Sequence, residues 1–490
     1  MRRTRHIVLC SVVLLALWCL SGTAQAQPVT IQANTEPGDA FGHAVALAGS
    51  YLLVSANGEN DNAGAVYVFR QTTRGWVQEA RLTPPNAPVA HKFGHHLALD
   101  GQTIVIGEPQ HPRPFPGTGA VYIFERNVAG AWVLIKTLSP PNPGIARNFG
   151  AVHLNGDTLL VGATGADGAV ERQGAVYLYG RHHGGVNAWG LVTTLLAPDG
   201  AFEDRFGSIE QQGSTTLIGA PQHDTASPNA GAVYHFTRNA DAPDLWDFKT
   251  KLIASDGTQD DAFGNQIIMQ DDLMLVGASN ADGKSPEAGA AYLFARNAES
   301  RDAWQQVAKL TASDGAPGDQ FGHALAMDEN LIVIGAPRHD GLGHDTGALY
   351  VFARQAEAPT AWKQVAKLTM PSGSDNDAFA QALALRDGLL LVGAPGALSK
   401  TGAAYLYDLS KPLATELLSF ERLAHSDQGL PDLAVEVILQ DREGFLWFGT
   451  AEGLHRYDGY TFKTYHHDPA DATSLSPGIV LSLMEDRQGR

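Results

Sequence analysis

Two histidine–aspartate pairs are the residues of this chain that most resemble chemical machinery. His339-Asp340 and His344-Asp345 lie close together in one polar stretch. An imidazole beside a carboxylate can serve acid–base catalysis or bind a ligand. Most pairs of this kind are solvated turns, however. We therefore treat the stretch as a candidate ligand-binding loop and predict no active site there.

Similar residue types occur in equivalent loops elsewhere in the chain. The candidate ligand-binding residues are Arg113, His223, Asp224, Arg338, His339, Asp340, His344 and Asp345. The one weak metal candidate is Asp282, because Asn280-Ala281-Asp282-Gly283 is too short to supply the roughly six to eight oxygens that Ca²⁺ requires. The sequence has no Ser/His/Asp signature, no phosphate loop and no specific metal-ligand spacing. We predict no catalytic residues, no cofactor and no enzyme activity.

A repeat positions these loops. Phe-Gly recurs six times and Phe-Ala once, at intervals of 52 to 58 residues, beginning at Phe41, Phe93, Phe149, Phe206, Phe263, Phe321 and Phe379. Each copy continues with an alternating run, a Gly-Ala-Pro variant, a Gly-Ala-Val-Tyr variant and, except in the last, a tryptophan. This order indicates four strands per copy. Seven four-stranded units predict an all-β, seven-bladed β-propeller.

The repeat also assigns roles to its recurring residues. The second strand is apolar throughout, as in Leu331-Ile332-Val333-Ile334, and should be buried between blades. Aromatic rings that recur in every blade are best explained by packing between blades. The aspartates that precede Phe-Gly are best explained by hydrogen bonds from nearby backbone N–H groups to their side chains. The candidate residues fall in the variable loops between the second and third strands, where recognition residues usually lie.

The N-terminal segment is expected to close the ring. The seventh copy ends without a tryptophan strand, and residues 29–39 match residues 309–319, which lead into the sixth copy. We predict that this segment supplies the outer strand of the last blade, so that residues 27–410 form one complete propeller.

Composition and the N-terminus indicate an exported protein. The formal net charge of −18 disfavours nucleic acid and anionic membranes as partners. Residues 1–26 have the form of a signal peptide, with a basic start, an apolar stretch and small residues before Gln27. Both cysteines lie in this segment, and no later stretch reaches the roughly 18 apolar residues of a membrane span. We expect a periplasmic or extracellular location.

The repeat resembles the FG-GAP family, whose propellers include those of integrin α subunits. Ile334-Gly335-Ala336-Pro337 and Leu391-Val392-Gly393-Ala394-Pro395 carry the resemblance, which covers some 380 residues. Integrin-like members place a calcium loop between Phe-Gly and Gly-Ala-Pro. Here only a tight hairpin fills that interval, so the calcium sites do not carry over.

A different pattern begins after Ser410. Residues 411–422 read as a linker, and residues 423–490 resemble the start of a two-component regulator propeller, with Gly444-Phe445-Leu446-Trp447-Phe448-Gly449-Thr450 as the specific match. The resemblance implies the extracytoplasmic sensor of a hybrid histidine kinase or diguanylate cyclase. Fewer than two blades are present, so we expect a chain cut short of a longer receptor.

Two functions remain open, with a third less favoured. The first is a non-catalytic, extracytoplasmic ligand-sensing region of a bacterial signal-transduction receptor. The second is a secreted or cell-surface adhesion or protein-binding propeller with integrin-α-like repeats. A propeller enzyme is the remaining alternative, because function does not follow from fold. The expected partner is a small molecule, glycan or protein.

Overall fold

The computed structural model describes residues 28–85, 91–109, 118–142, 147–297, 300, 302–355, 358–370, 373–409, 435–440, 445–450, 453–457, 462–467, 471 and 474–475. The chain divides into two compact units, residues 1–415 and 416–490, and each is described by itself. The proposed signal peptide and Arg113 lie outside the described residues.

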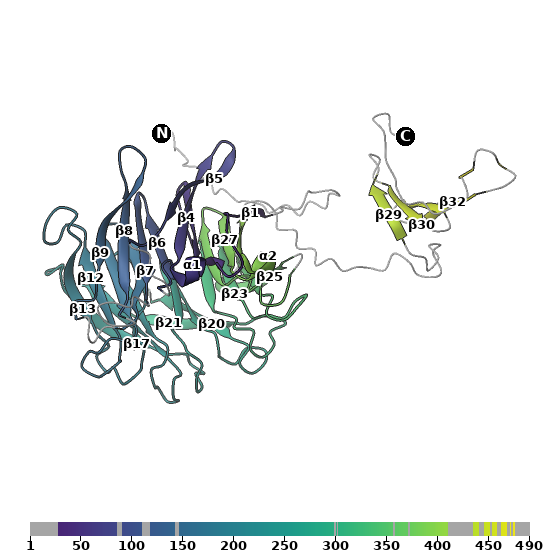
Figure 1. The fold of residues 1–490 in the computed structure, drawn as a ribbon. Coiled ribbons are helices and arrows are strands. Elements are labelled where there is room, and N and C mark those ends of the chain that lie inside the picture. The colour runs from purple at the N-terminus through teal and green to yellow at the C-terminus, as the bar shows by residue number, and fades with distance from the viewer. Residues whose placement is uncertain are drawn as a thin grey trace, which may run out of the picture. The chain divides into compact units, whose positions relative to one another are not determined.

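The first unit is a ring of seven four-stranded antiparallel sheets, which confirms the predicted seven-bladed β-propeller (Figure 1). Six blades run outward from the channel in chain order. The first three are β2 (Phe41–Ala48), β3 (Tyr51–Ala56), β4 (Ala65–Thr72) and β5 (Gly75–Leu82); β6 (His96–Asp100), β7 (Thr103–Glu108), β8 (Ala120–Arg126) and β9 (Trp132–Leu138); and β10 (Phe149–Asn155), β11 (Thr158–Ala163), β12 (Ala175–Gly180) and β13 (Gly190–Leu195). The next three are β14 (Ser208–Gln212), β15 (Thr215–Ala220), β16 (Ala232–Arg238) and β17 (Trp246–Leu252); β18 (Gln266–Gln270), β19 (Leu273–Ala278), β20 (Ala290–Arg296) and β21 (Trp304–Leu310); and β22 (Ala324–Met327), β23 (Leu331–Ala336), β24 (Ala348–Gln355) and β25 (Ala358–Thr369).

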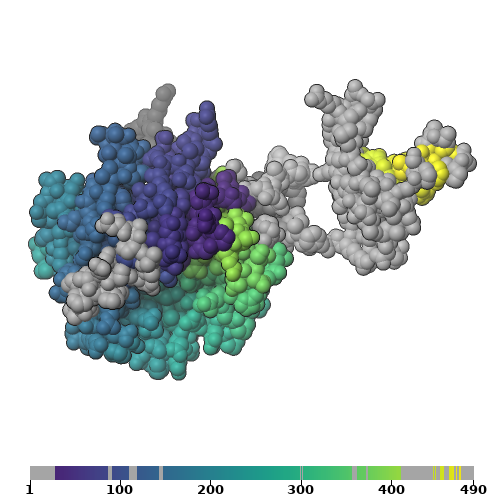
Figure 2. All heavy atoms as spheres, viewed as in Figure 1, coloured from purple at the N-terminus to yellow at the C-terminus, as the bar shows by residue number. Residues whose placement is uncertain are grey.

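The seventh blade joins the two ends of the unit. It contains β26 (Ala382–Arg386), β27 (Leu389–Ala394), β28 (Ala403–Asp408) and the N-terminal β1 (Val29–Ile31). β1 pairs with β28 in the register Val29 to Leu406 and Ile31 to Ala404. The predicted closure by the N-terminal strand is therefore confirmed, and Figure 2 shows the purple first blade against the green last one.

A glycine at the seam explains how closely the blades approach. Gly402 has a φ of +85° and pairs with Phe41 of the first blade. A Cβ atom there would lie 2.2 Å from the carbonyl oxygen of Phe41. A bridge between the corresponding glycine and the next phenylalanine recurs at five of the other blade boundaries, so one backbone device joins these blades.

Each Phe-Gly phenylalanine anchors the core of its own blade. Phe41 is fully buried, and its ring meets those of Tyr67 and Phe69 edge-on, at centroid distances of 5.5 and 6.4 Å. The second strands are almost wholly buried, as their apolar runs predicted. The recurrent tryptophans pack against these cores, although Trp189 lies just before β13 instead of within it.

Two short helical turns, α1 (Glu59–Asn62) and α2 (Ala397–Lys400), fill the loops between the second and third strands of the first and last blades. The described part of the second unit contains one four-stranded antiparallel sheet, formed by β29 (Val435–Gln440), β30 (Leu446–Thr450), β31 (Gly453–Tyr457) and β32 (Phe462–Tyr465). This sheet is the partial second propeller expected from the sequence. No helix within the described ranges is long and apolar enough to cross a bilayer.

Candidate functional site

The candidate histidine His223 is buried inside its loop. Its Nδ1 lies 2.9 Å from the Asp204 carboxylate and its Nε2 lies 3.1 Å from the Lys251 ammonium. Lysine can only donate, so the ring accepts at Nε2 and donates from Nδ1 to Asp204. Asp199 accepts hydrogen bonds from Lys251 and from the Tyr234 hydroxyl at 2.6 and 2.7 Å. This network ties the β15–β16 loop to the loop that enters the blade.

The same network recurs two blades later. His339 Nδ1 lies 2.8 Å from Asp319, and Lys367 lies 2.7 Å from its Nε2. Asp314 accepts from Lys367 and from the Tyr350 hydroxyl at 2.6 and 2.9 Å. Both histidines have all their ring nitrogens engaged and are less than a tenth exposed. The geometry gives them a bracing role within the blade.

Three of the candidate aspartates are exposed and hold the turns of their loops. Asp224, Asp282 and Asp340 each accept the backbone N–H of the residue five positions later, at 2.8, 3.0 and 2.9 Å. The residues at those later positions have positive φ values of 49° to 55°. The side-chain bond therefore stabilises an otherwise unfavourable backbone turn.

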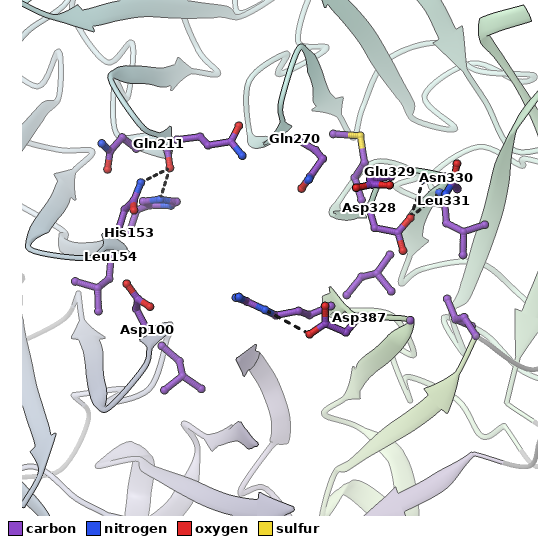
Figure 3. Close-up of a pocket in the computed structure, with 18 residues that line it drawn as sticks. Asp100, His153, Leu154, Gln211, Gln270, Asp328, Glu329, Asn330, Leu331 and Asp387 are labelled. Carbon is purple, nitrogen blue, oxygen red and sulfur yellow. Dashed lines mark hydrogen bonds and ion pairs between the residues drawn. The ribbon is translucent and has the colours of Figure 1, made fainter. Parts of the chain in front are cut away.

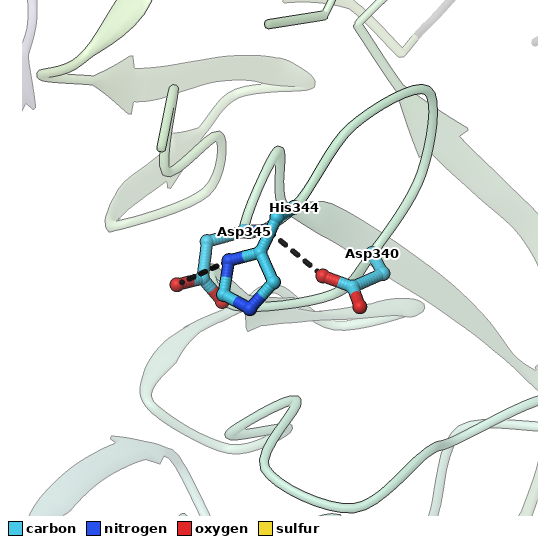
Figure 4. A group of neighbouring side chains, drawn as sticks. All are labelled: Asp340, His344 and Asp345. Carbon is cyan, nitrogen blue, oxygen red and sulfur yellow. Dashed lines mark hydrogen bonds and ion pairs between the residues drawn. The ribbon is translucent and has the colours of Figure 1, made fainter. Parts of the chain in front are cut away.

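The second histidine–aspartate pair forms a small surface group (Figure 4). His344 Nδ1 lies 3.2 Å from Asp345, and one ligand atom from each of Asp340, His344 and Asp345 lies within 4.8 Å of the others. Asp340 already accepts the Asp345 N–H, and His344 is 71% exposed. Arg338 lies apart from this group, in a separate hollow beside Gln320 and Asp260.

A cavity lies elsewhere, at the end of the central channel where the first and second strands of the blades turn (Figure 3). It has a volume of about 860 Å³. Six blades supply its wall through the turns or ends of their innermost strands, and the lining includes Asp100, His153, Gln211, Gln270, Asp328, Glu329, Arg386 and Asp387.

Carboxylates dominate the rim of this cavity. Asp100, Asp328, Glu329 and Asp387 line it, whereas Arg386 is the one arginine or lysine among the lining residues. Asp328 also accepts the N–H groups of two residues in its own turn. Clustered charges of one sign raise the local concentration of the opposite charge, so the rim favours cationic ligands.

A pair of titratable groups, His153 and Glu210, lies on the channel wall. His153 Nδ1 and the Glu210 carboxylate are 3.6 Å apart, and Nε2 of His153 donates to the Gln211 carbonyl at 2.9 Å. Burial raises the pKa of Glu210 to about 8 and lowers the pKa of His153 to about 4. Near pH 7 both groups are therefore neutral, so the wall is less charged than the rim.

Histidines also gather where the inner strands begin. The rings of His43 and His95 have centroids 4.9 Å apart, and those of His95 and His96 are 4.6 Å apart. Burial, with the neighbouring His95 and other positive groups, lowers the pKa of His43 to about 3, and burial lowers that of His96 to about 3. The sequence contains a weak signal for part of this cluster, because His43 and His95 each directly follow Phe-Gly, as His323 does.

Sequence reasoning missed the channel wall. His153, Glu210 and Gln211 interrupt strands that otherwise alternate, and polar residues in an innermost strand are the signal that could have identified them.

Family models match both units. The FG-GAP repeat matches six segments that together cover more than half of the chain, at residues 31–69, 76–124, 189–236, 246–294, 304–352 and 362–407. The two component regulator propeller matches residues 429–452, which include β30.

Among known proteins, Histidine kinase P4 of Formosa agariphila is 50% identical over 48 residues, which are 10% of this chain and 4% of that protein. A solved protein from Lactobacillus plantarum has 15% identity and a TM-score of 0.47, with 70% of this chain and 88% of that chain covered. The extracellular domain of a putative one component system from B. thetaiotaomicron has 14% identity and a TM-score of 0.40, with 95% and 51% covered.

Proposed function

This chain belongs to the FG-GAP repeat family, and from that premise we propose that it is the extracytoplasmic ligand-sensing region of a bacterial signal-transduction receptor. The first unit would bind the ligand and the second would begin the part that connects it to an output domain. We propose a periplasmic or extracellular location and a binding role without catalysis.

The regulator-propeller match is the observation that carries this proposal. It falls at residues 429–452, outside the FG-GAP segments, and the surrounding residues form a separate four-stranded sheet. The relative that shares 50% identity over 48 residues is named a histidine kinase. A second propeller-type segment of this kind favours a receptor over a free-standing adhesion protein.

Sequencing the gene beyond the codon for Arg490 tests the receptor assignment. We expect further regulator-propeller repeats, a membrane span and a histidine kinase or diguanylate cyclase. Unrelated sequence at that point would favour a secreted binding or adhesion protein instead.

Within the ring, we propose that the cavity at the channel mouth takes the ligand, and that this ligand is a small cation. The support is the volume of about 860 Å³ and the excess of carboxylates around it. The rim consists of turns at the ends of neighbouring inner strands, and the packed blades would hold these turns at fixed distances from one another. A rigid rim loses little conformational entropy on binding.

Spermidine is a suitable probe for the channel mouth. It should raise the melting temperature of the chain, and added NaCl should reduce the shift. The double variant Glu329→Gln/Asp387→Asn should weaken this response, whereas Asp224→Asn on the other loops should not. Citrate serves as the anionic control. Equal shifts in all variants would refute the cationic mouth while leaving the receptor assignment untouched.

A further inference from the structure

One position in each blade lies at or next to the start of the innermost strand. It directly follows Phe-Gly, or Phe-Ala in the last blade. Its backbone N–H donates to the carbonyl three residues earlier, at 3.1 Å, in the blades of His43, His95, His323 and Gln381. The four residues therefore occupy equivalent positions in one type of backbone turn.

These four residues lie on consecutive blades. The inner strands β22, β26, β2 and β6 contact one another in that order, across the seam where the ring closes. His323, Gln381, His43 and His95 thus form one arc, although they are spread over 338 positions of the sequence, from 43 to 381. The blades opposite carry Ala151, Ser208 and Asn265 at this position.

The arc has a geometry suited to a metal ion. Two imidazoles bound to one ion at about 2 Å, at a tetrahedral angle, have ring centroids about 5 Å apart. The centroids of His43 and His95 are 4.9 Å apart. The rings are tilted by 60°, and rotation about the Cβ–Cγ bond, a soft torsion in histidine, would turn their nitrogens toward a common point.

An unsatisfied nitrogen supports the same conclusion independently. Nδ1 of His95 is buried and has no hydrogen-bond partner among the described residues. A buried polar atom without a partner costs free energy, and a bound ligand would remove that cost. At the edge of the arc, the Gln381 amide lies 2.8 Å from Nε2 of His323, which fixes the orientation of that ring.

We propose that His43 and His95 bind a divalent transition-metal ion of the Zn²⁺ or Cu²⁺ class at this end of the channel. Imidazole nitrogens suit these ions, and water would complete the coordination. Lys92, whose charge acts on both proposed ligands, opposes the ion and would keep its affinity moderate. The site is independent of the proposed cationic mouth.

Calorimetric titration of the untagged chain with ZnCl₂ tests this proposal. The chain should bind about one ion, and His43→Gln or His95→Gln should lower the affinity by more than about tenfold. Lys92→Gln should raise the affinity, an effect that a purely structural histidine cluster would not produce. Cu²⁺ should give an electron paramagnetic resonance spectrum with coupling to two nitrogens.

Two control variants separate this site from others. His344→Gln removes the exposed Asp340–His344–Asp345 group, and His153→Gln changes the channel wall; neither should alter the titration. Circular dichroism checks that each variant is folded. Binding that survives His43→Gln/His95→Gln but disappears in His344→Gln would overturn the proposal, as would the absence of binding to the unaltered chain.

Discussion

At the scale of single residues, the buried His339 and the exposed His344 of one loop have different roles. His339 lies between Asp319 and Lys367, with both ring nitrogens engaged, whereas His344 is largely exposed. Two histidines that lie close together in the sequence therefore need not have the same role. The neighbours that the fold supplies decide the role of each ring.

This difference predicts unequal costs of substitution. His339→Ala should lower the free energy of unfolding by about 2 kcal/mol, because it leaves the buried Asp319 carboxylate without its imidazole partner. His344→Ala should change it by less than about 0.5 kcal/mol. Urea unfolding of the two variants measures the difference. Equal small losses would mean that the network around His339 does not brace the loop.

Glu210 makes a prediction about pH. Burial raises its pKa to about 8, so the folded chain retains a proton that the unfolded chain releases near its ordinary value of 4.5. The stabilisation is complete below that ordinary value and is lost as the pH rises through 8. Glu210→Gln should therefore flatten the fall in melting temperature between about pH 5 and 8, relative to the unaltered chain.

The exposed carboxylate of Glu329 provides the control for this measurement. Glu329→Gln should leave the pH dependence of the melting temperature as it is. If the curves for Glu210→Gln and the unaltered chain run parallel, the Glu210 carboxyl is not held in its protonated form by the channel.

At the scale of the strand, two glycines with almost the same φ separate the cost of backbone strain from the cost of a clash between blades. Gly347 and Gly318 have φ values of +84° and +87°. A Cβ at Gly347 would lie 2.2 Å from the Phe379 carbonyl oxygen, whereas one at Gly318 meets nothing within 4 Å. Gly318→Ala should cost about 1 kcal/mol from the backbone alone, and Gly347→Ala at least about 3 kcal/mol. Similar costs in chemical denaturation would show that the blades can separate to accommodate the methyl group.

Strand β1 closes the ring through one buried residue. Ile31 is 4% exposed and packs with Phe41 and Leu406, whereas Val29 on the same strand is 55% exposed. Ile31→Ala should reduce the free energy of unfolding by about 2 to 4 kcal/mol, and Val29→Ala by well under about 1 kcal/mol. Equal effects of the two substitutions in thermal unfolding would mean that the N-terminal strand does not stabilise the closed ring.

The strands and the closure were predictable because repetition makes their pattern redundant. Six copies of Phe-Gly and one of Phe-Ala reveal one turn, and the match between residues 29–39 and 309–319 reveals the missing strand. The channel was not predictable in the same way. Its lining comes from single side chains on different blades, such as His153 and Glu210, whose meeting depends on the ring and on no local pattern.

At the scale of the whole ring, the two ends of the channel differ in chemistry. The end where the strands begin carries His43, His95 and His96 near Lys92, and the opposite mouth carries a rim of carboxylates. A sevenfold repeat alone would make each end uniform. Substitutions at the non-repeating inner positions therefore give the ring its specific character, while the repeating positions maintain the fold.

The two units should differ in their resistance to opening. In the ring, β27 is buried between blades, with Leu390, Leu391 and Val392 fully inaccessible. The described part of the second unit is one four-stranded sheet, and a propeller-type blade needs neighbours to bury its faces. Amide hydrogen exchange should therefore be much faster in β29–β31 than in β27, because local opening of the lone sheet requires less free energy. Protection in β29–β31 equal to that in β27 would show that this sheet is stabilised as fully as a blade of the closed ring.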